Sequence, residues 1–256
     1  MGFHLHKWYL DCTTDSGEVV LIYAGDVLLG RLRIPYVEVL ASAPGGDAER
    51  RRRISGRVSV HPVAQGVSLD APALSVTGTW TKTGQPIELT LLDEPEGTIR
   101  WHCHQVCGTA TVSLSSGHQI TGAGYVEELT MDVRPWAVPF RELRWGRFVA
   151  PGRSLVWIDW RGGTNRRWVF CDGKPVTAGT VETNCVEWPS GRLDIEPGRV
   201  LRQARIGRTM AGPLAWCLPR SIARATESKW VSRAVLHESE RAPQSAWVVH
   251  EVVRWA

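Results

Sequence analysis

Short hydrophobic runs, each four to nine residues long, recur along the whole chain and are separated by turn residues. Val, Ile, Thr and Trp dominate these runs, and hydrophobic and polar positions alternate in many of them, as in strands with one buried face. The runs lie at residues 18–23, 57–60, 87–92, 98–101, 109–114, 155–160, 167–170 and 245–253. Because 25 glycines and 15 prolines punctuate the chain, the pattern predicts an all-β sandwich or barrel.

The two halves of the chain repeat one arrangement. In each half a Trp is followed about seven residues later by a turn, and then by a hydrophobic strand that closes on glycine. The first copy begins at Trp8 and the second at Trp145. A chain of 256 residues is long enough to bury two small cores. We therefore expect two antiparallel barrels packed together, formed by residues 1–133 and 134–256.

Tryptophan is unusually frequent, with 13 Trp against 4 Phe and 4 Tyr. Its side chain is large, rigid and amphipathic, so it suits both the wall of a cavity and the packing between sheets. Composition alone leaves these two interpretations open.

The charge pattern favours no nucleic-acid partner. The formal net charge is +4, and no basic stripe is interleaved with aromatic residues. The one basic run, Arg50–Arg53, follows Ala-Pro-Gly-Gly-Asp and is interpreted as a solvated loop. No segment reaches the about 18 apolar residues that a membrane span needs, and the first residues lack the apolar core of a signal peptide. We expect a cytoplasmic monomer or homodimer.

The cysteines and histidines predict no metal site. The segment 101–107 reads Trp-His-Cys-His-Gln-Val-Cys, and in a strand Cys103 and Cys107 face one way while His102 and His104 face the other. No second pair stands at zinc-finger spacing. The six cysteines lack a disulfide spacing and are expected to be reduced, mostly buried thiols; they are Cys12, Cys103, Cys107, Cys171, Cys185 and Cys217. No cofactor is expected either, since phosphate loops, dinucleotide fingerprints and serine elbows are lacking.

Four segments together resemble a known family. They are Gly-Ala-Gly-Tyr-Val-Glu at 122–127, Pro-Trp-Ala-Val-Pro at 135–139, Leu-Arg-Trp-Gly-Arg-Phe at 143–148 and Val-Trp-Ile-Asp-Trp at 156–160. This region resembles the signature of the carotenoid 1,2-hydratase-like (hydroxyneurosporene synthase-like) family of lipocalin/calycin-type proteins. Two features depart from that pattern: the acid is Glu rather than Asp, and about 17 residues separate it from Trp-Gly. The resemblance implies a lipocalin-like fold.

Glu127 is the first candidate catalytic residue. In an alternating strand it shares one face with Tyr125 and with two apolar residues, and we expect this face to point into the barrel. Burial raises the pKa of a carboxyl group and so suits it to general acid catalysis. The alternative is a structural ion pair with Arg144 or Arg147.

The resemblance adds a role for this acid. It implies that Glu127 protonates a carbon–carbon double bond and that aromatic walls stabilise the resulting cation. Tyr125 is the second catalytic candidate, because its hydroxyl can orient a substrate carbonyl. The alternative for Tyr125 is a buried tyrosine with a structural hydrogen bond.

Five further residues are predicted to bind substrate: Trp136, Trp145, Arg147, Trp157 and Asp159. The tryptophans would line a hydrophobic cavity, and an arginine beside it would bind a carboxylate or an enolate. The alternatives are core packing for the tryptophans and a surface position for the arginine.

These observations predict a cofactor-independent enzyme that hydrates, isomerises or cyclises a hydrophobic small molecule such as an isoprenoid, polyene or polyketide. Glu127 would supply the proton, or the cavity would promote a pericyclic cyclisation by shape alone. The alternative is a non-catalytic lipocalin-like carrier of a hydrophobic ligand. A structural interaction module, with a filled barrel, is the third possibility.

Overall fold

The computed structural model describes residues 2–54, 57–115, 117–206, 219, 223–239 and 241–255. Strands predominate in these ranges, and every hydrophobic run named above overlaps a strand, so the all-β prediction is confirmed. The chain divides into two compact units, Met1–Arg134 (unit 1) and Pro135–Ala256 (unit 2). Each unit contains one antiparallel sheet.

The sheet of unit 1 has eleven strands in the described residues. They are β1 (Phe3–Thr13), β2 (Val19–Leu29), β3 (Leu32–Ser42), β4 (Glu49–Ile54), β5 (Ser59–Val63), β6 (Gly66–Ala71), β7 (Val76–Lys82), β8 (Ile87–Glu94), β9 (Gly97–Gln105), β10 (Gly108–Ser113) and β11 (Gln119–Met131). Their order is β4-β3-β2-β1-β11-β10-β7-β6-β5, and β9 pairs with both β11 and β8. One 3-10 turn, η1 (Pro72–Leu74), follows β6.

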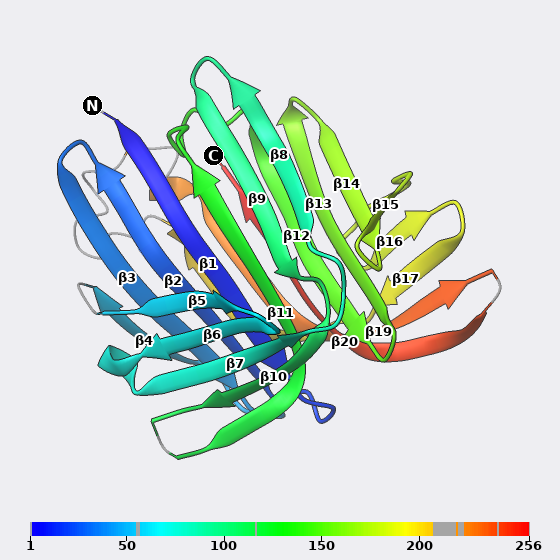
Figure 1. Cartoon of the computed structure of the whole chain (residues 1–256). Helices are drawn as coiled ribbons and strands as arrows, with labels where there is room; N and C mark the ends of the chain where they lie inside the picture. The colour runs from blue at the N-terminus through cyan, green and yellow to red at the C-terminus, as the bar shows by residue number, and fades with distance from the viewer. Residues whose placement is uncertain are drawn as a thin grey trace. The chain divides into compact units, whose positions relative to one another are not determined.

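This sheet curls (Figure 1), and strands from its two halves share one hydrophobic core. Residues of β1, β2 and β3 pack there against residues of β6, β7 and β10. We call the side of the sheet that lines this core the core face and the other side the reverse face. Trp80 belongs to this core, is 1% exposed, and donates a hydrogen bond from Nε1 to the Asp11 carbonyl oxygen at 2.7 Å. Gly124 gives this ring room, because a Cβ there would lie 2.8 Å from Trp80 Cδ1.

The arginine run is a strand, so its interpretation as a loop is wrong. Residues 50–53 lie in β4, which pairs with β3 at the edge of the sheet. Arg50 and Arg52 point to Glu38 on β3, and Arg51 donates to the carbonyl oxygen of Leu74. These contacts stabilise the extended conformation of this polar segment. Charged side chains also suit an edge strand because they discourage pairing with other chains.

Unit 2 has a nine-stranded sheet in its described residues. The strands are β12 (Phe140–Ala150), β13 (Arg153–Gly163), β14 (Arg166–Cys171), β15 (Lys174–Val176), β16 (Cys185–Trp188), β17 (Gly191–Ile195), β18 (Arg199–Arg205), β19 (Thr226–Glu238) and β20 (Arg241–Arg254). Their order is β15-β14-β13-β12-β20-β19-β17-β16, and β18 pairs with β19. Its own core contains Phe148, Leu155, Trp157, Trp188 and Val248. Gly146 lies beneath the ring of Trp157, as Gly124 lies beneath Trp80 in unit 1.

The cysteines agree with the expectation of free thiols as far as the structure describes them. None of the five described cysteines forms a disulfide, and three of them, Cys12, Cys103 and Cys185, are buried. Cys217 lies outside the described residues. Among the described residues, no helix has the length and apolar character that crossing a membrane requires.

Candidate functional site

Two tyrosine–acid pairs lie side by side on the reverse face of unit 1. Tyr9 and Asp11 belong to β1, Tyr125 and Glu127 belong to β11, and the antiparallel register places Tyr9 opposite Glu127 and Asp11 opposite Tyr125. Each phenol donates a hydrogen bond to the acid two residues later, Tyr9 to Asp11 Oδ2 at 2.8 Å and Tyr125 to Glu127 Oε2 at 2.7 Å. The two phenol rings meet edge to face, with centroids 6.0 Å apart. Alternation of side chains along a strand makes this arrangement possible.

A third strand completes the group. Trp101 of β9 donates from Nε1 to the same Glu127 oxygen, Oε2, at 2.6 Å. Tyr9, Asp11, Trp101, Tyr125 and Glu127 therefore form one hydrogen-bonded and ring-packed set, which we call the carboxyl cluster. Glu127 is 6% exposed, Trp101 3% and Tyr125 0%. Glu127 is thus held by two rigid aromatic donors and is more accessible than either of them.

The Tyr125 phenol and the Cys103 thiol beside Glu127 stay uncharged at physiological pH. Burial, reinforced by Cys103 and Glu127, raises the pKa of the Tyr125 phenol well above its usual value. Burial also raises the pKa of the Cys103 thiol well above its usual range. A buried phenol and thiol are disfavoured as anions because the protein interior solvates charge poorly. Proton transfer in the carboxyl cluster therefore falls to its carboxyl groups.

Glu127 does not point into the barrel, so the expected direction of its side chain is wrong. Val126 lies in the core of unit 1, and Glu127, its neighbour in an alternating strand, lies on the reverse face. Glu127 is nevertheless buried, as expected. Residues 124–127 are all buried, so both faces of β11 are covered here. Hydrophobicity therefore does not distinguish the two faces in this segment.

The five predicted substrate-binding residues are not brought together. Trp157 lies in the core of unit 2, and Asp159, two residues later, shares its face of β13. Trp145 and Arg147 lie on the other face of the sheet, since their neighbour Phe148 belongs to the core. Trp136 lies between β11 and β12 and is 40% exposed. Within unit 2, strand alternation thus separates these side chains.

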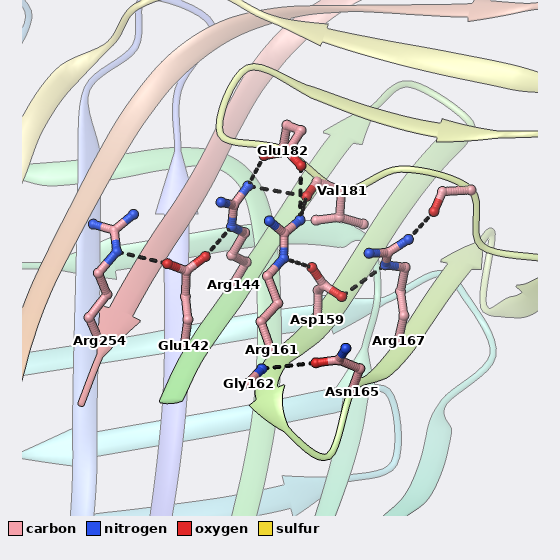
Figure 2. Close-up of polar contacts among 11 residues, drawn as sticks. Glu142, Arg144, Asp159, Arg161, Gly162, Asn165, Arg167, Val181, Glu182 and Arg254 are labelled. Atoms are coloured by element: carbon pink, nitrogen blue, oxygen red, sulfur yellow. Dashed lines mark hydrogen bonds and ion pairs between the residues drawn. The ribbon is translucent and has the colours of Figure 1, made fainter. Parts of the chain in front are cut away.

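Asp159 belongs to an ion-pair network (Figure 2). Its side chain is 2% exposed and accepts hydrogen bonds from Arg161 Nε at 2.6 Å and from Arg167 Nε at 2.8 Å. Arg161 and Arg144 both also donate to Glu182 and to the carbonyl oxygen of Val181. The network therefore ties the chain around residue 181 to β12 and β13.

The same network accounts for Arg144, which was a possible partner of Glu127. Arg144 Nε donates to Glu142 at 2.6 Å, and its Nη1 donates to Glu182. Val181 is fully buried in the core of unit 2, so this segment covers the core while the arginines hold it in place. These contacts are those of a structural network whose acids and arginines are mutually satisfied.

Trp145 and Arg147 are both buried. The Lys229 ammonium lies 5.1 Å from the centre of the Trp145 ring and pairs with Glu251 at 2.6 Å. Arg147 is 0% exposed and donates to the Trp247 carbonyl oxygen at 3.5 Å, so a surface position for this arginine is wrong.

Tyr9 and Trp101 of the carboxyl cluster were missed from the sequence. Tyr9-Leu10-Asp11 repeats the tyrosine–acid spacing of Tyr125-Val126-Glu127, and that repeat was available as a signal. Trp101 carried no comparable signal. It reaches Glu127 only because β9 pairs with β11, and strand pairing is a property of the tertiary structure.

Comparisons with known proteins concern the fold. No protein-family model and no curated protein matches the sequence. A candidate AttH protein from Nitrosomonas europaea has a TM-score of 0.62 at 8% identity, covering 98% of this chain and 92% of that one. CghA, solved with Sch210972, has a TM-score of 0.62 at 11% identity, with coverage of 99% and 89%. Kievitone hydratase from Nectria haematococca has a TM-score of 0.60 at 8% identity, with coverage of 98% and 88%.

At these identities the likeness shows the fold alone. The chain has a fold that kievitone hydratase also has, over nearly the whole length of both proteins. This agrees with the fold that the resemblance to the hydratase-like family implies.

Proposed function

We propose that this protein is an enzyme that transfers a proton to a hydrophobic small molecule and thereby hydrates, isomerises or cyclises it. One observation carries the proposal: a buried carboxyl group, Glu127, is held by the Tyr125 phenol and the Trp101 indole through hydrogen bonds of 2.7 and 2.6 Å to one oxygen. A buried acid with fixed donors is oriented for proton transfer, and its surroundings stabilise charge poorly unless it is paired.

In this proposal the two oxygens of Glu127 have different tasks. Because Oε2 accepts two hydrogen bonds, a proton on this carboxyl group is carried by Oε1. In the proposed reaction Oε1 gives its proton to one carbon of a carbon–carbon double bond, and the electron pair of that bond forms the new C–H bond. The remaining carbocation is attacked by water, attacked by a second double bond, or loses a neighbouring proton. Each route finally releases a proton, which restores the acid.

The aromatic residues around Glu127 suit such an intermediate. A carbocation is stabilised by the face of an aromatic ring, as in other cation–π contacts. Tyr9, Tyr23 and Tyr125 lie on the reverse face with Glu127. The distance between ring centroids is 5.3 Å for Tyr9 and Tyr23 and 6.0 Å for Tyr9 and Tyr125. The fold shared with a hydratase supports the same class of reaction. No redox chemistry is required for it.

The test is turnover of a panel of isoprenoid, polyene and polyketide compounds in D2O, followed by mass spectrometry. A proton delivered by Glu127 exchanges with solvent, so the product acquires deuterium on carbon. Glu127→Gln keeps the size of the side chain and a carbonyl acceptor for both donors but removes the acid. We expect it to lower turnover by about 10²–10⁴-fold, the usual contribution of general acid catalysis.

The matched control is Glu227→Gln in unit 2. Glu227 is also a buried glutamate, 9% exposed, and pairs with Arg202 at 3.1 Å. We expect it to retain turnover. Conversion without deuterium that survives Glu127→Gln would indicate a cyclisation directed by shape. Tight binding of many apolar compounds without conversion would indicate the carrier.

A further inference from the structure

Three histidines and a glutamate gather on the core face of unit 1, on the other side of the sheet from Glu127. His6 comes from β1, His102 and His104 from β9, and Glu128 from β11. His6 Nε2 lies 2.6 Å from Glu128 Oε1, and His104 Nε2 lies 2.8 Å from Glu128 Oε2. Ligand atoms of His102, His104 and Glu128 all lie within 4.8 Å of one another. We call these four residues the histidine cluster.

The pairing of β9 with β11 is irregular beside the histidine cluster. Gln105 pairs with Val126 and Cys103 pairs with Glu127, so His104 is an extra residue between them. Such a bulge changes the direction of the local side chains. The rings of His102 and His104 lie with their centroids 3.7 Å apart and inclined at 33°. Both imidazoles thus lie beside the carboxylate of Glu128.

The neighbouring residues hold the cluster in position. Trp8 stacks on the His104 ring, with centroids 4.6 Å apart, and belongs to the hydrophobic core of unit 1. His6 engages the Glu128 oxygen that His104 does not. The side chains of His102, His104 and Glu128 are 30%, 16% and 24% exposed, so ions can reach the cluster from solvent.

We propose that His102, His104 and Glu128 bind one divalent transition-metal ion of the zinc type, with His6 as a positioning residue. A donor set of two imidazoles and one carboxylate favours such ions over Mg²⁺ or Ca²⁺. Metal–ligand bonds of about 2.0–2.2 Å place neighbouring ligand atoms about 3.4 Å apart in a tetrahedron. Small side-chain rotations therefore suffice to close the site.

The fourth position of this site falls to water or another small ligand, as in zinc sites with three protein ligands. His6 then donates its Nε2 proton to Glu128 Oε1, which leaves Oε2 directed at the metal. Carboxylates and histidines beside metal ligands act in this way in many proteins. The site does not depend on the proposed reaction, because Glu127 and Glu128 point to opposite faces of β11.

The test is titration of the untagged, EDTA-treated full chain with Zn²⁺ by isothermal calorimetry. We expect one tight equivalent, which Glu128→Gln and His104→Ala each weaken at least about 100-fold and His6→Ala weakens about 10–100-fold. His118→Ala is the matched control, because His118 also pairs with a glutamate, Glu18 at 2.8 Å, on the same unit. Circular dichroism of each metal-free variant shows that it is folded.

Two optical readouts locate the ion. Cu²⁺ bound at His104 quenches the fluorescence of the stacked Trp8, so the quenching is expected to shrink in Trp8→Phe. Co²⁺ in the site is expected to show visible bands without a thiolate charge-transfer band, because no cysteine is a ligand. A thiolate band, a Zn²⁺ affinity that Glu128→Gln leaves unchanged, or binding no tighter in the wild type than in His104→Ala would overturn the proposal.

Discussion

Asp159→Asn is expected to destabilise unit 2 strongly while leaving the size of the side chain unchanged. The Asp159 carboxylate is 2% exposed and accepts hydrogen bonds at 2.6 and 2.8 Å from Arg161 and Arg167. Arg161 also donates to the carbonyl oxygen of Val181, so the acid helps to hold the segment that covers the core (Figure 2). Neutralising the acid removes the negative charge that the two guanidinium groups share.

The magnitude follows from the burial of the three groups. Removing one partner from a fully buried ion pair costs about 3–5 kcal/mol, because the remaining charge is left poorly solvated. The side chains of Arg161 and Arg167 are 27% and 33% exposed, so water reaches them in part and lowers the cost. We therefore expect Asp159→Asn to lower the free energy of unfolding by about 3 kcal/mol, which corresponds to a decrease of roughly 6–12 °C in Tm for a chain of this size.

The assay is thermal unfolding followed by calorimetry, with Asp194→Asn as the control. Asp194 also pairs with an arginine of unit 2, Arg192, at 2.5 Å, but its side chain is 45% exposed. An exposed pair contributes about 0–1 kcal/mol, so the control is expected to change Tm by a few degrees at most. Equal shifts for the two variants would refute the reasoning. An unchanged Tm with weaker substrate binding would instead assign Asp159 to ligand recognition.

Two further predictions concern packing and pH. Gly124→Ala is expected to destabilise unit 1 by about 1–3 kcal/mol, because the added Cβ crowds Trp80. Urea unfolding measures this loss. Gly46→Ala is the control and is expected to have little effect, because the nearest atom to its Cβ would be 3.6 Å away. Burial, followed by the charge of Lys229, lowers the pKa of His250 from 6.5 to about 4, so the unfolded chain takes up a proton that the native chain does not. Stability is therefore expected to fall by up to about 3 kcal/mol as the pH drops from 6.5 to 4. Urea midpoints across this range check the effect, and His250→Gln is expected to flatten it; an equally steep fall in that variant would contradict the assignment.

Local sequence predicts the strands well because alternation and turn residues act over a few positions. The run at 87–92 lies in β8 and the run at 155–160 lies in β13. The same rule correctly placed His102 and His104 on one face of β9 and Cys103 on the other, as the contacts of His102 and His104 with Glu128 confirm. It did not predict β4, because four consecutive arginines have no alternation. That strand pairs with β3, where Glu38 accepts the ion pairs of Arg50 and Arg52.

The candidate site depended on strand pairing. The sequence singled out Glu127 and Tyr125, and these residues are buried and hydrogen-bonded to each other. It did not show that Trp101 would reach Glu127, or that His104 would reach Glu128, because β9 and β11 are neighbours only in the folded sheet.

The sequence by itself determined that the chain is built from β-strands, because side-chain alternation and turn residues are local properties. Only the tertiary structure decided which face of β11 lines the barrel, since residues 124–127 are buried on both sides and hydrophobicity offers no contrast there. Register and pairing then directed Glu127 towards Trp101 on the reverse face and Glu128 towards the histidines on the core face. Adjacent residues of one strand thus belong to two different sites, because neighbouring side chains in a strand point in opposite directions.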